Sequence, residues 1–259
     1  MAVVFRVFLL TLVSTAALAG TAWDFSVCAT REENWFGERE GERQHWIETT
    51  TSCRTGTARV DGARIAVAWD CCGATPQAPK PENYAAVSTD GGRTFTHLDD
   101  ESQTWWTDRV AGCPSDLWMF GLLGGSVRVR SVTFSPAPVP GATTPYSADV
   151  ELETSTKFVI PFRDTVEWTV RVDRTATPLP GATGVIRLLD DDALFRCTDL
   201  IVGNPRRVVA ESESEAPRAE RPLVTRIVIE LANARPWQPE ASTFEVPEEW
   251  REVEEPDEP

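Results

Sequence analysis

The chain has 259 residues, with 25 lysine and arginine residues, 40 aspartate and glutamate residues, and a formal net charge of −15 at pH 7. This length permits one large domain or two small ones, with a sizeable core in either case. The negative charge argues against nucleic acids and anionic membranes as partners, because contacts with phosphate groups need clustered lysine and arginine.

Residues 1–19 have the pattern of a secretory signal peptide. Arg6 provides a short positive start, an apolar stretch covers 7–13, and Ala17-Leu18-Ala19 matches an A-x-A cleavage site. The apolar stretch is short for a membrane span, and no later stretch is long enough for one. We therefore expect a secreted or periplasmic protein with no membrane insertion after signal cleavage.

An N-terminal β region is expected over 20–134. Residues 20–56 are polar and weakly periodic, and we interpret them as loops. Residues 64–71 alternate between apolar and polar side chains with a period of two, which predicts a strand with one buried face. A second alternation, over 127–134, slips by one residue at Ser131, which indicates a β-bulge.

A loop containing four prolines over 135–146 precedes a C-terminal β region over 147–235, which we expect to pack on the first region. Residues 236–259 form an acidic, proline-containing tail that we expect to be extended or disordered. No segment shows sustained helical periodicity. The strands predicted in the C-terminal region are 150–160, 166–172, 185–189, 195–202, 207–210 and 227–231.

A hairpin is predicted where Ser88-Thr89-Asp90-Gly91-Gly92-Arg93-Thr94-Phe95 joins two strand-compatible segments. Asp90-Gly91 is a two-residue turn signal, because glycine reaches positive φ without strain. The Asp90 carboxylate can accept backbone N–H bonds inside the turn. Phe95 is large enough to anchor the second strand in a core.

Five residues of this segment, namely Ser88, Asp90, Gly92, Thr94 and Phe95, match the fixed positions of the Asp-box (BNR) motif, S-x-D-x-G-x-T-[FW]. Residues 64–98 therefore resemble part of one blade of a sialidase-like β-propeller. In that family the Asp-box is a structural turn away from the active site, so the resemblance implies a fold and no catalysis.

About a dozen short strands at regular spacing predict an all-β protein, an antiparallel β-sandwich-like fold that carries one Asp-box hairpin. The alternative is a small or partial β-propeller. A closed propeller needs at least four blades of four strands, about sixteen in all, which is more than the chain offers.

Six cysteines predict up to three disulfides in an exported protein. Because five precede the proline loop and one follows it, complete pairing would require a bridge across that loop. A free, buried Cys197 is the alternative, and connectivity stays open. The sequence has no C-x-x-C motif and only two histidines, which argues against a metal site. It indicates no cofactor. The cysteines are Cys28, Cys53, Cys71, Cys72, Cys113 and Cys197.

Ten tryptophans against two tyrosines are unusual. Three of them lie in segments that resemble loops, namely Trp35, Trp105 and Trp106. An exposed indole in a loop could bind a sugar ring or a protein. Most tryptophans of a β protein, however, lie in its core. Acidic clusters at 99–101 and 190–192 could bind Ca²⁺, but solvated turns explain them better. We expect a secreted, non-catalytic recognition module for glycan or protein, with a divergent sialidase-like glycoside hydrolase as the alternative.

Overall fold

The computed structural model describes residues 20–39, 42–71, 83–113, 117–119, 123–156, 162–190, 193–215, 219 and 221–254. Three short helical segments occur in it, α1 (Ala182–Leu188), α2 (Leu194–Cys197) and the 3₁₀ helix η1 (Ala241–Phe244). The strands are β1 (Gly20–Arg39), β2 (Glu42–Asp61), β3 (Arg64–Cys71), β4 (Asn83–Ser88), β5 (Thr94–Asp99), β6 (Thr104–Arg109), β7 (Leu117–Met119), β8 (Leu123–Ser135), β9 (Tyr146–Thr156), β10 (Phe162–Arg174), β11 (Pro205–Ser214), β12 (Leu223–Trp237) and β13 (Arg251–Glu252).

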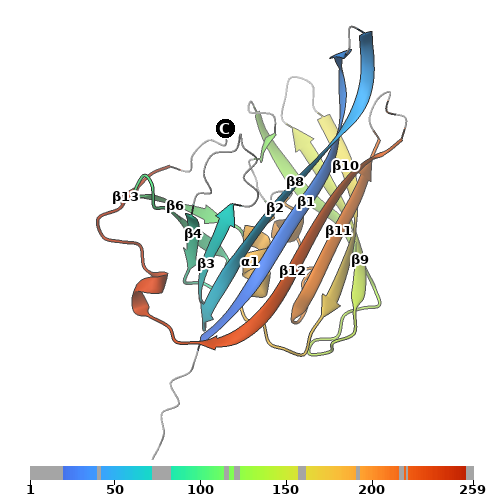
Figure 1. The fold of residues 1–259 in the computed structure, drawn as a ribbon. Helices are drawn as coiled ribbons and strands as arrows, with labels where there is room; N and C mark the ends of the chain where they lie inside the picture. Colours follow the sequence, from blue (N-terminus) through green and yellow to red (C-terminus); the bar gives the residue numbers. More distant parts are fainter. Residues whose placement is uncertain are drawn as a thin grey trace, which may run out of the picture.

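All of these strands belong to a single sheet (Figure 1), in the order β13-β6-β5-β4-β3-β2-β1-β12-β11-β10-β9-β8-β7. Neighbours are antiparallel, except that β13 runs parallel to β6. The prediction of a mostly antiparallel β protein is therefore confirmed. The two-sheet sandwich and the propeller blades are wrong for the described chain, because the strands form one continuous layer.

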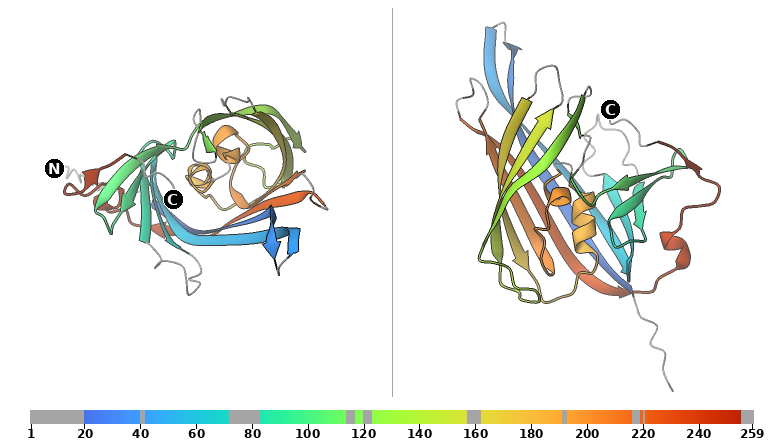
Figure 2. Two further views of the ribbon diagram at one scale, coloured as in Figure 1. Left: turned by 90° about the horizontal axis from the view of Figure 1, so that it is seen from above. Right: turned by 180° about the vertical axis from the view of Figure 1, so that it is seen from behind.

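The sheet curls around α1 and α2, which lie in its concavity (Figure 2). We call the concave side the inner face. Alternate residues of β1, such as Trp23 and Phe25, point to this side and are almost fully buried. The indole N–H of Trp23 donates a hydrogen bond to the carbonyl oxygen of Pro180, at 3.0 Å, just before α1. The core thus lies between the curved sheet and its two helices.

The two helices correct the sequence analysis, which predicted strands over 185–189 and 195–202. Val185, Ile186 and Leu188 of α1 are all buried. Only Thr183 and Arg187 of this short helix are partly exposed, so it has no broad polar face and its sequence shows no sustained period of 3.6 residues. A short, mostly apolar run such as 185–189, which only Arg187 interrupts, does not distinguish a buried strand from a buried helix.

Residues 20–56 also differ from expectation, because they belong to two long paired strands and are not loops. β1 and β2 pair in one continuous register from Thr21 opposite Val60 to Arg39 opposite Glu42. Cys28 lies directly opposite Cys53, and the two form a disulfide with a Cα–Cα distance of 4.1 Å. The polar composition reflects strands that face solvent over much of their length.

The second disulfide joins Cys113, after β6, to Cys197 at the end of α2, across a sequence separation of 84 residues. It crosses the proline loop, as complete pairing would require, and Cys197 is not free. The side chain of Cys71 and all of Cys72 lie outside the described residues. Two disulfides are consistent with an oxidising compartment, extracellular or periplasmic. The predicted signal peptide, residues 1–19, also lies outside the described residues.

Several local predictions hold. The register between β8 and β9 shifts between Val129 and Ser131, where the bulge was expected. The alternating segment 166–172 lies within β10, with Trp168 and Val170 buried. Of the segment 150–160, the described part belongs to β9. No helix in the described part of the chain is long and apolar enough to cross a membrane.

The segment after β12 carries structure as far as residue 254. Phe244 of η1 is buried, and its ring meets that of Trp237 edge to face, with centroids 5.8 Å apart. β13 then pairs with the edge strand β6, and the amide of Val253 donates to the carbonyl oxygen of Trp105 at 2.9 Å. The acidic segment therefore crosses the outer face of the sheet and covers one of its edges.

Candidate recognition surface

The turn at Ser88–Phe95 is organised by two side chains. The Ser88 hydroxyl donates to Asp90 Oδ1 at 2.8 Å and accepts the Gly92 amide at 3.0 Å. Asp90 Oδ1 also accepts the amides of Arg93 and Thr94, at 2.9 and 3.1 Å. The connection between β4 and β5 covers residues 89–93, so the expected two-residue turn is wrong, because the carboxylate gathers a wider loop around itself.

Electrostatics and packing agree on a structural role for this turn. Burial acts to raise the pKa of Asp90, but the hydrogen bonds from Thr94, Ser88 and Arg93 outweigh it and hold the pKa below its usual value. Phe95 is fully buried in the core. Gly92 touches the backbone of Gly184 in α1, so the turn supports the helix inside the sheet. These contacts give the residues of the turn a structural role in the fold.

Trp105 and Trp106 lie on opposite faces of β6 and are both half-buried. Trp106 lies opposite His97 on the inner face, and the two rings stack with centroids 5.1 Å apart and planes 5° apart. Trp105 lies opposite Leu98 on the outer face, beside the pairing with β13. Neither indole is an open platform, so the expected binding role of this pair has no geometric support.

The stacked and buried His97 belongs to an inner-face cluster with the partly buried Asp108 and Arg196. Burial lowers the pKa of His97 to about 4, with the carboxylate of Asp108 opposing the shift and the guanidinium of Arg196 adding to it. Arg196 of α2 forms an ion pair with Asp108 of β6 at 3.2 Å. Because Arg196 immediately precedes Cys197, the ion pair and the second disulfide attach α2 to the same part of the sheet.

A two-stranded arm, which we define as residues 32–39 and 42–53, extends beyond the rest of the sheet at the top of Figure 1. Strand β12 pairs with β1 only as far as Arg31, and β3 pairs with β2 only from Arg54. In the described chain both edges of the arm therefore lack a neighbouring strand. The arm is an extension of the two central strands and not a separate element.

The base of this arm is fixed in three ways. The Cys28–Cys53 disulfide joins its two strands. Both carboxylate oxygens of Glu32 accept hydrogen bonds from Arg221, at 2.6 and 2.7 Å, and the amide of Val224 donates to the same group at 3.0 Å. The Arg221 hydrogen bonds, followed by that from Val224, lower the pKa of Glu32 to about 2. An isolated two-stranded hairpin is only marginally stable, so these contacts provide needed support.

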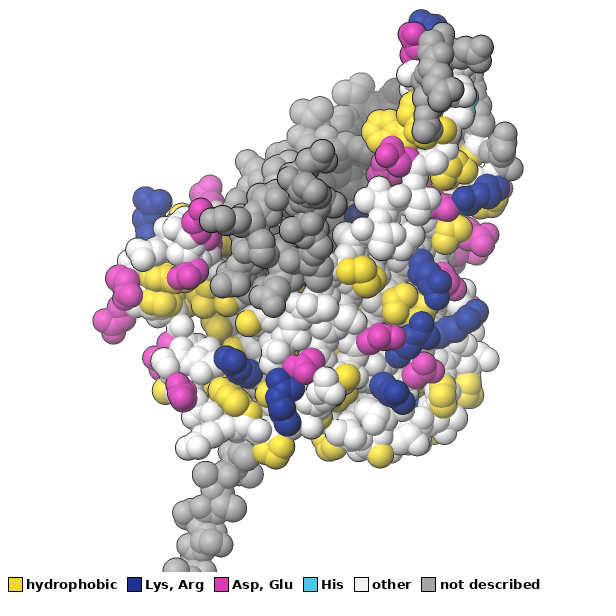
Figure 3. Space-filling view, viewed as in Figure 1, with side chains coloured by type: hydrophobic (Ala, Val, Ile, Leu, Met, Phe, Trp, Pro, Cys, Tyr) yellow, Lys and Arg dark blue, Asp and Glu magenta, His cyan; other side chains and the backbone are white. Residues whose placement is uncertain are grey.

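Aromatic side chains lie on both faces of the arm. Trp35 lies opposite Trp46, and Phe36 lies opposite His45 with ring centroids 4.6 Å apart. The indole of Trp46 covers Gly37, where a Cβ atom would lie 3.3 Å from its ring. Trp35 and Phe36 remain 46% and 58% exposed, which is high for such large apolar groups. Figure 3 shows hydrophobic side chains along this projection, at the upper right.

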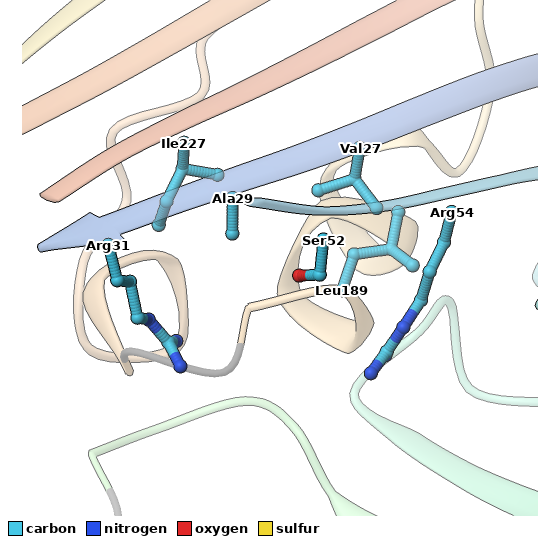
Figure 4. A pocket seen from close by; sticks show the side chains of 7 residues that line it. All are labelled: Val27, Ala29, Arg31, Ser52, Arg54, Leu189 and Ile227. Carbon is cyan, nitrogen blue, oxygen red and sulfur yellow. The ribbon is translucent and has the colours of Figure 1, made fainter. Parts of the chain in front are cut away.

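A shallow pocket lies on the inner face next to the base of the arm (Figure 4). Arg31 from β1 and Arg54 from β2 both point into the space beside Leu189, and Ser52 lies between them. The lining of this pocket therefore includes two guanidinium groups, from neighbouring strands. The carboxylate pair required for glycoside hydrolysis is absent from its described lining.

The two acidic clusters have local roles where they are described. Asp99 accepts the amides of Glu101 and Ser102 and the Ser102 hydroxyl, in a turn between β5 and β6. Asp190 is buried and accepts the amides of Phe195 and Arg196 at the start of α2. Within the described residues, no group of three or more histidine, cysteine, aspartate or glutamate side chains could hold a metal ion.

No protein-family model matches the chain, and no curated protein matches it either. Of the tryptophans singled out from the sequence, Trp35 lies on the arm, whereas Trp105 and Trp106 lie on the edge strand β6. The sequence analysis missed Phe36, His45 and Trp46. A signal was present, because Trp35-Phe36 and His45-Trp46 are mirror images about residues 40–41, as Cys28 and Cys53 also are.

Proposed function

We propose that this protein is a non-catalytic recognition module of an oxidising compartment, which binds its partner through the aromatic arm. The observation that carries this proposal is the exposure of Trp35 and Phe36 on a projection whose base is held by a disulfide and by Glu32. Rigid, exposed aromatic side chains contribute most of the binding energy at many interfaces. Because the disulfide and the Glu32 contacts hold the base of the arm, less backbone entropy is lost there when the partner binds.

The resemblance of Ser88–Phe95 to an Asp-box hairpin belongs to the same proposal. The hydrogen bonds that Asp90 accepts within its own turn support it. The resemblance gives the arm no function, because the turn lies against α1 and has its own structural role. The recognition proposal therefore depends on the arm alone.

The test compares the wild-type protein with a Trp35→Ser/Phe36→Ser variant on glycan and peptide arrays, beside a panel of fluorogenic glycosides. Val139→Ser is the matched control, since Val139 is 62% exposed and lies in the proline loop, away from the arm. We expect the arm variant to lose about tenfold or more in affinity, and the control to bind as the wild type does.

Unchanged binding by a folded arm variant would overturn the proposal. Steady turnover of a glycoside would replace it with the alternative, a divergent sialidase-like glycoside hydrolase. Near-ultraviolet circular dichroism and thermal melting of each variant establish that the rest of the protein remains folded.

A further inference from the structure

The face of the arm that carries Trp35 also carries charge. Glu33 and Glu48 lie directly opposite each other, one inner-face pair closer to the base than Trp35 and Trp46, and both are exposed. Side chains two residues apart on a strand are separated by about 7 Å, so the carboxylates and indoles form one continuous surface. Like charges directly opposite each other destabilise a strand pair.

The arm as a whole has the same sign of charge. Between residues 32 and 50 the sequence has six glutamates and two arginines, a formal charge of −4, within a chain of charge −15. Arg221 neutralises one of these glutamates, Glu32. A cation placed between Glu33 and Glu48 would relieve their repulsion, and the exposed indole of Trp35 attracts cations through its π face. A partner that is complementary to this surface is therefore positively charged. A second copy of the chain would bring the same negative charge and is disfavoured.

The backbone of the arm indicates the kind of cationic partner. In the described chain, strand pairing ends at Arg31 on one edge of the arm and at Arg54 on the other, and a strand edge of this kind can pair with another extended chain. A polypeptide supplies such groups at regular intervals, whereas a saccharide does not. We infer that the arm binds an extended, basic polypeptide segment, with its arginine or lysine side chains over Glu33, Glu48 and Trp35.

This inference rests on the proposed recognition function and specifies its partner. The probe is a fluorescent peptide of about ten residues that alternates arginine and valine, titrated in anisotropy measurements at about 0.05 M and about 0.5 M salt. A peptide that alternates glutamate and valine, a neutral chito-oligosaccharide and phosphatidylserine vesicles are the comparison ligands. We expect only the basic peptide to bind, and its affinity to fall with added salt.

Three single variants locate the contact. Glu33→Gln and Glu48→Gln should each weaken binding of the basic peptide about threefold, whereas Glu38→Gln, on the opposite face of the same arm, should change it less than about 1.5-fold. Glu38 is exposed like the other two, so it is a matched control. An equal loss in all three variants would show a diffuse charge effect and overturn the inference.

The failures of the two proposals are distinguishable. Binding of the oligosaccharide or the vesicles through Trp35, with no effect of Glu33→Gln, would overturn the basic-segment inference and leave the recognition function standing. A second result would lead to the same conclusion: the basic peptide does not bind to the wild type, but ligands on the arrays do, and the Trp35→Ser/Phe36→Ser variant no longer binds them. Array binding that survives that variant would overturn both.

Discussion

Gly92 of the β4–β5 turn and Gly184 of α1 are packed backbone against backbone. A Cβ atom built on Gly92 would lie 2.6 Å from the Cα of Gly184, and one built on Gly184 would lie 2.7 Å from the Cα of Gly92. Only the absence of both side chains allows this approach. The contact joins a surface turn to the helix inside the sheet, so it connects the local hairpin with the tertiary fold.

Substitution of Gly92 by alanine should therefore destabilise the protein by about 3 kcal/mol, through overpacking and its positive φ of 78°. Urea denaturation measures the change. Gly91→Ala is the matched control, because Gly91 has a φ of 79° but no atom within 4 Å of its Cβ position. It should cost about 1 kcal/mol, from backbone strain alone. Equal losses in the two variants would contradict the close packing.

Removal of the Asp90 carboxylate should lower stability at neutral pH by about 1 kcal/mol, since the Arg93 and Thr94 amides lose their acceptor in an Asp90→Ala variant. The pKa of Asp90 is below its ordinary 3.8 in the folded protein. The contribution of the Asp90 carboxylate to the free energy of unfolding is therefore present above pH 3.8. It is lost as the pH falls through the lower pKa that Asp90 has in the folded protein. Melting temperatures of wild type and variant should converge toward acid pH. Asp100→Asn, on an exposed neighbouring turn, should leave the profile unchanged.

Protonation of His97 should destabilise the fold. Its pKa falls from 6.5 to about 4 on folding, so below pH 6.5 the unfolded chain binds a proton that the folded chain does not. The contribution of neutral His97 to the free energy of unfolding is complete above pH 6.5. It decreases by roughly 3 kcal/mol as the pH falls toward 4. A His97→Phe variant, which keeps a ring against Trp106, should show a flatter dependence over this interval in urea denaturation.

His45 provides the control for that measurement, because it is exposed on the arm. His45→Gln should retain the wild-type dependence of stability on pH. The role assigned to His97 would be wrong if His97→Phe and the wild type lost stability in parallel between pH 6.5 and pH 4.

Loss of the Cys113–Cys197 disulfide should reduce stability more than loss of Cys28–Cys53. The first closes a separation of 84 residues and the second one of 25. In the chain-entropy model these loops correspond to about 4.5 and about 3.5 kcal/mol. Paired Cys→Ser variants of each bridge, compared by chemical denaturation, test the order. The reverse order would mean that local support of the arm matters more than the link between α2 and the sheet.

Local features were predicted well from the sequence because their causes lie within a few residues. The alternation over 64–71, the bulge at Ser131 and the buried Phe95 each depend on side-chain type and a period of two. Counting cysteines predicted a bridge across the proline loop only if all six were paired, and the structure contains such a bridge between Cys113 and Cys197. The count could not predict which cysteines form a disulfide with each other, because pairing depends on which strands become neighbours.

The arm and the helices were misread for opposite reasons. Both faces of the arm are largely solvated, so its strands lack the apolar alternation that identifies a half-buried strand. The inner helix α1 is buried except for the partly exposed Thr183 and Arg187, so it lacks the broad polar stripe that identifies an amphipathic helix. In each case the pattern that sequence reasoning depends on arises only when one side of an element faces solvent and the other faces a core.

The amino-acid sequence alone thus determined that the chain is acidic, mostly β and has an even number of cysteines, because composition and short-range alternation carry that information. Tertiary structure decided that one curved sheet encloses two helices and that two central strands continue outward as an aromatic arm. Those outcomes depend on contacts between distant residues, such as Gly92 with Gly184 and Glu32 with Arg221, whose approach only the folded backbone brings about.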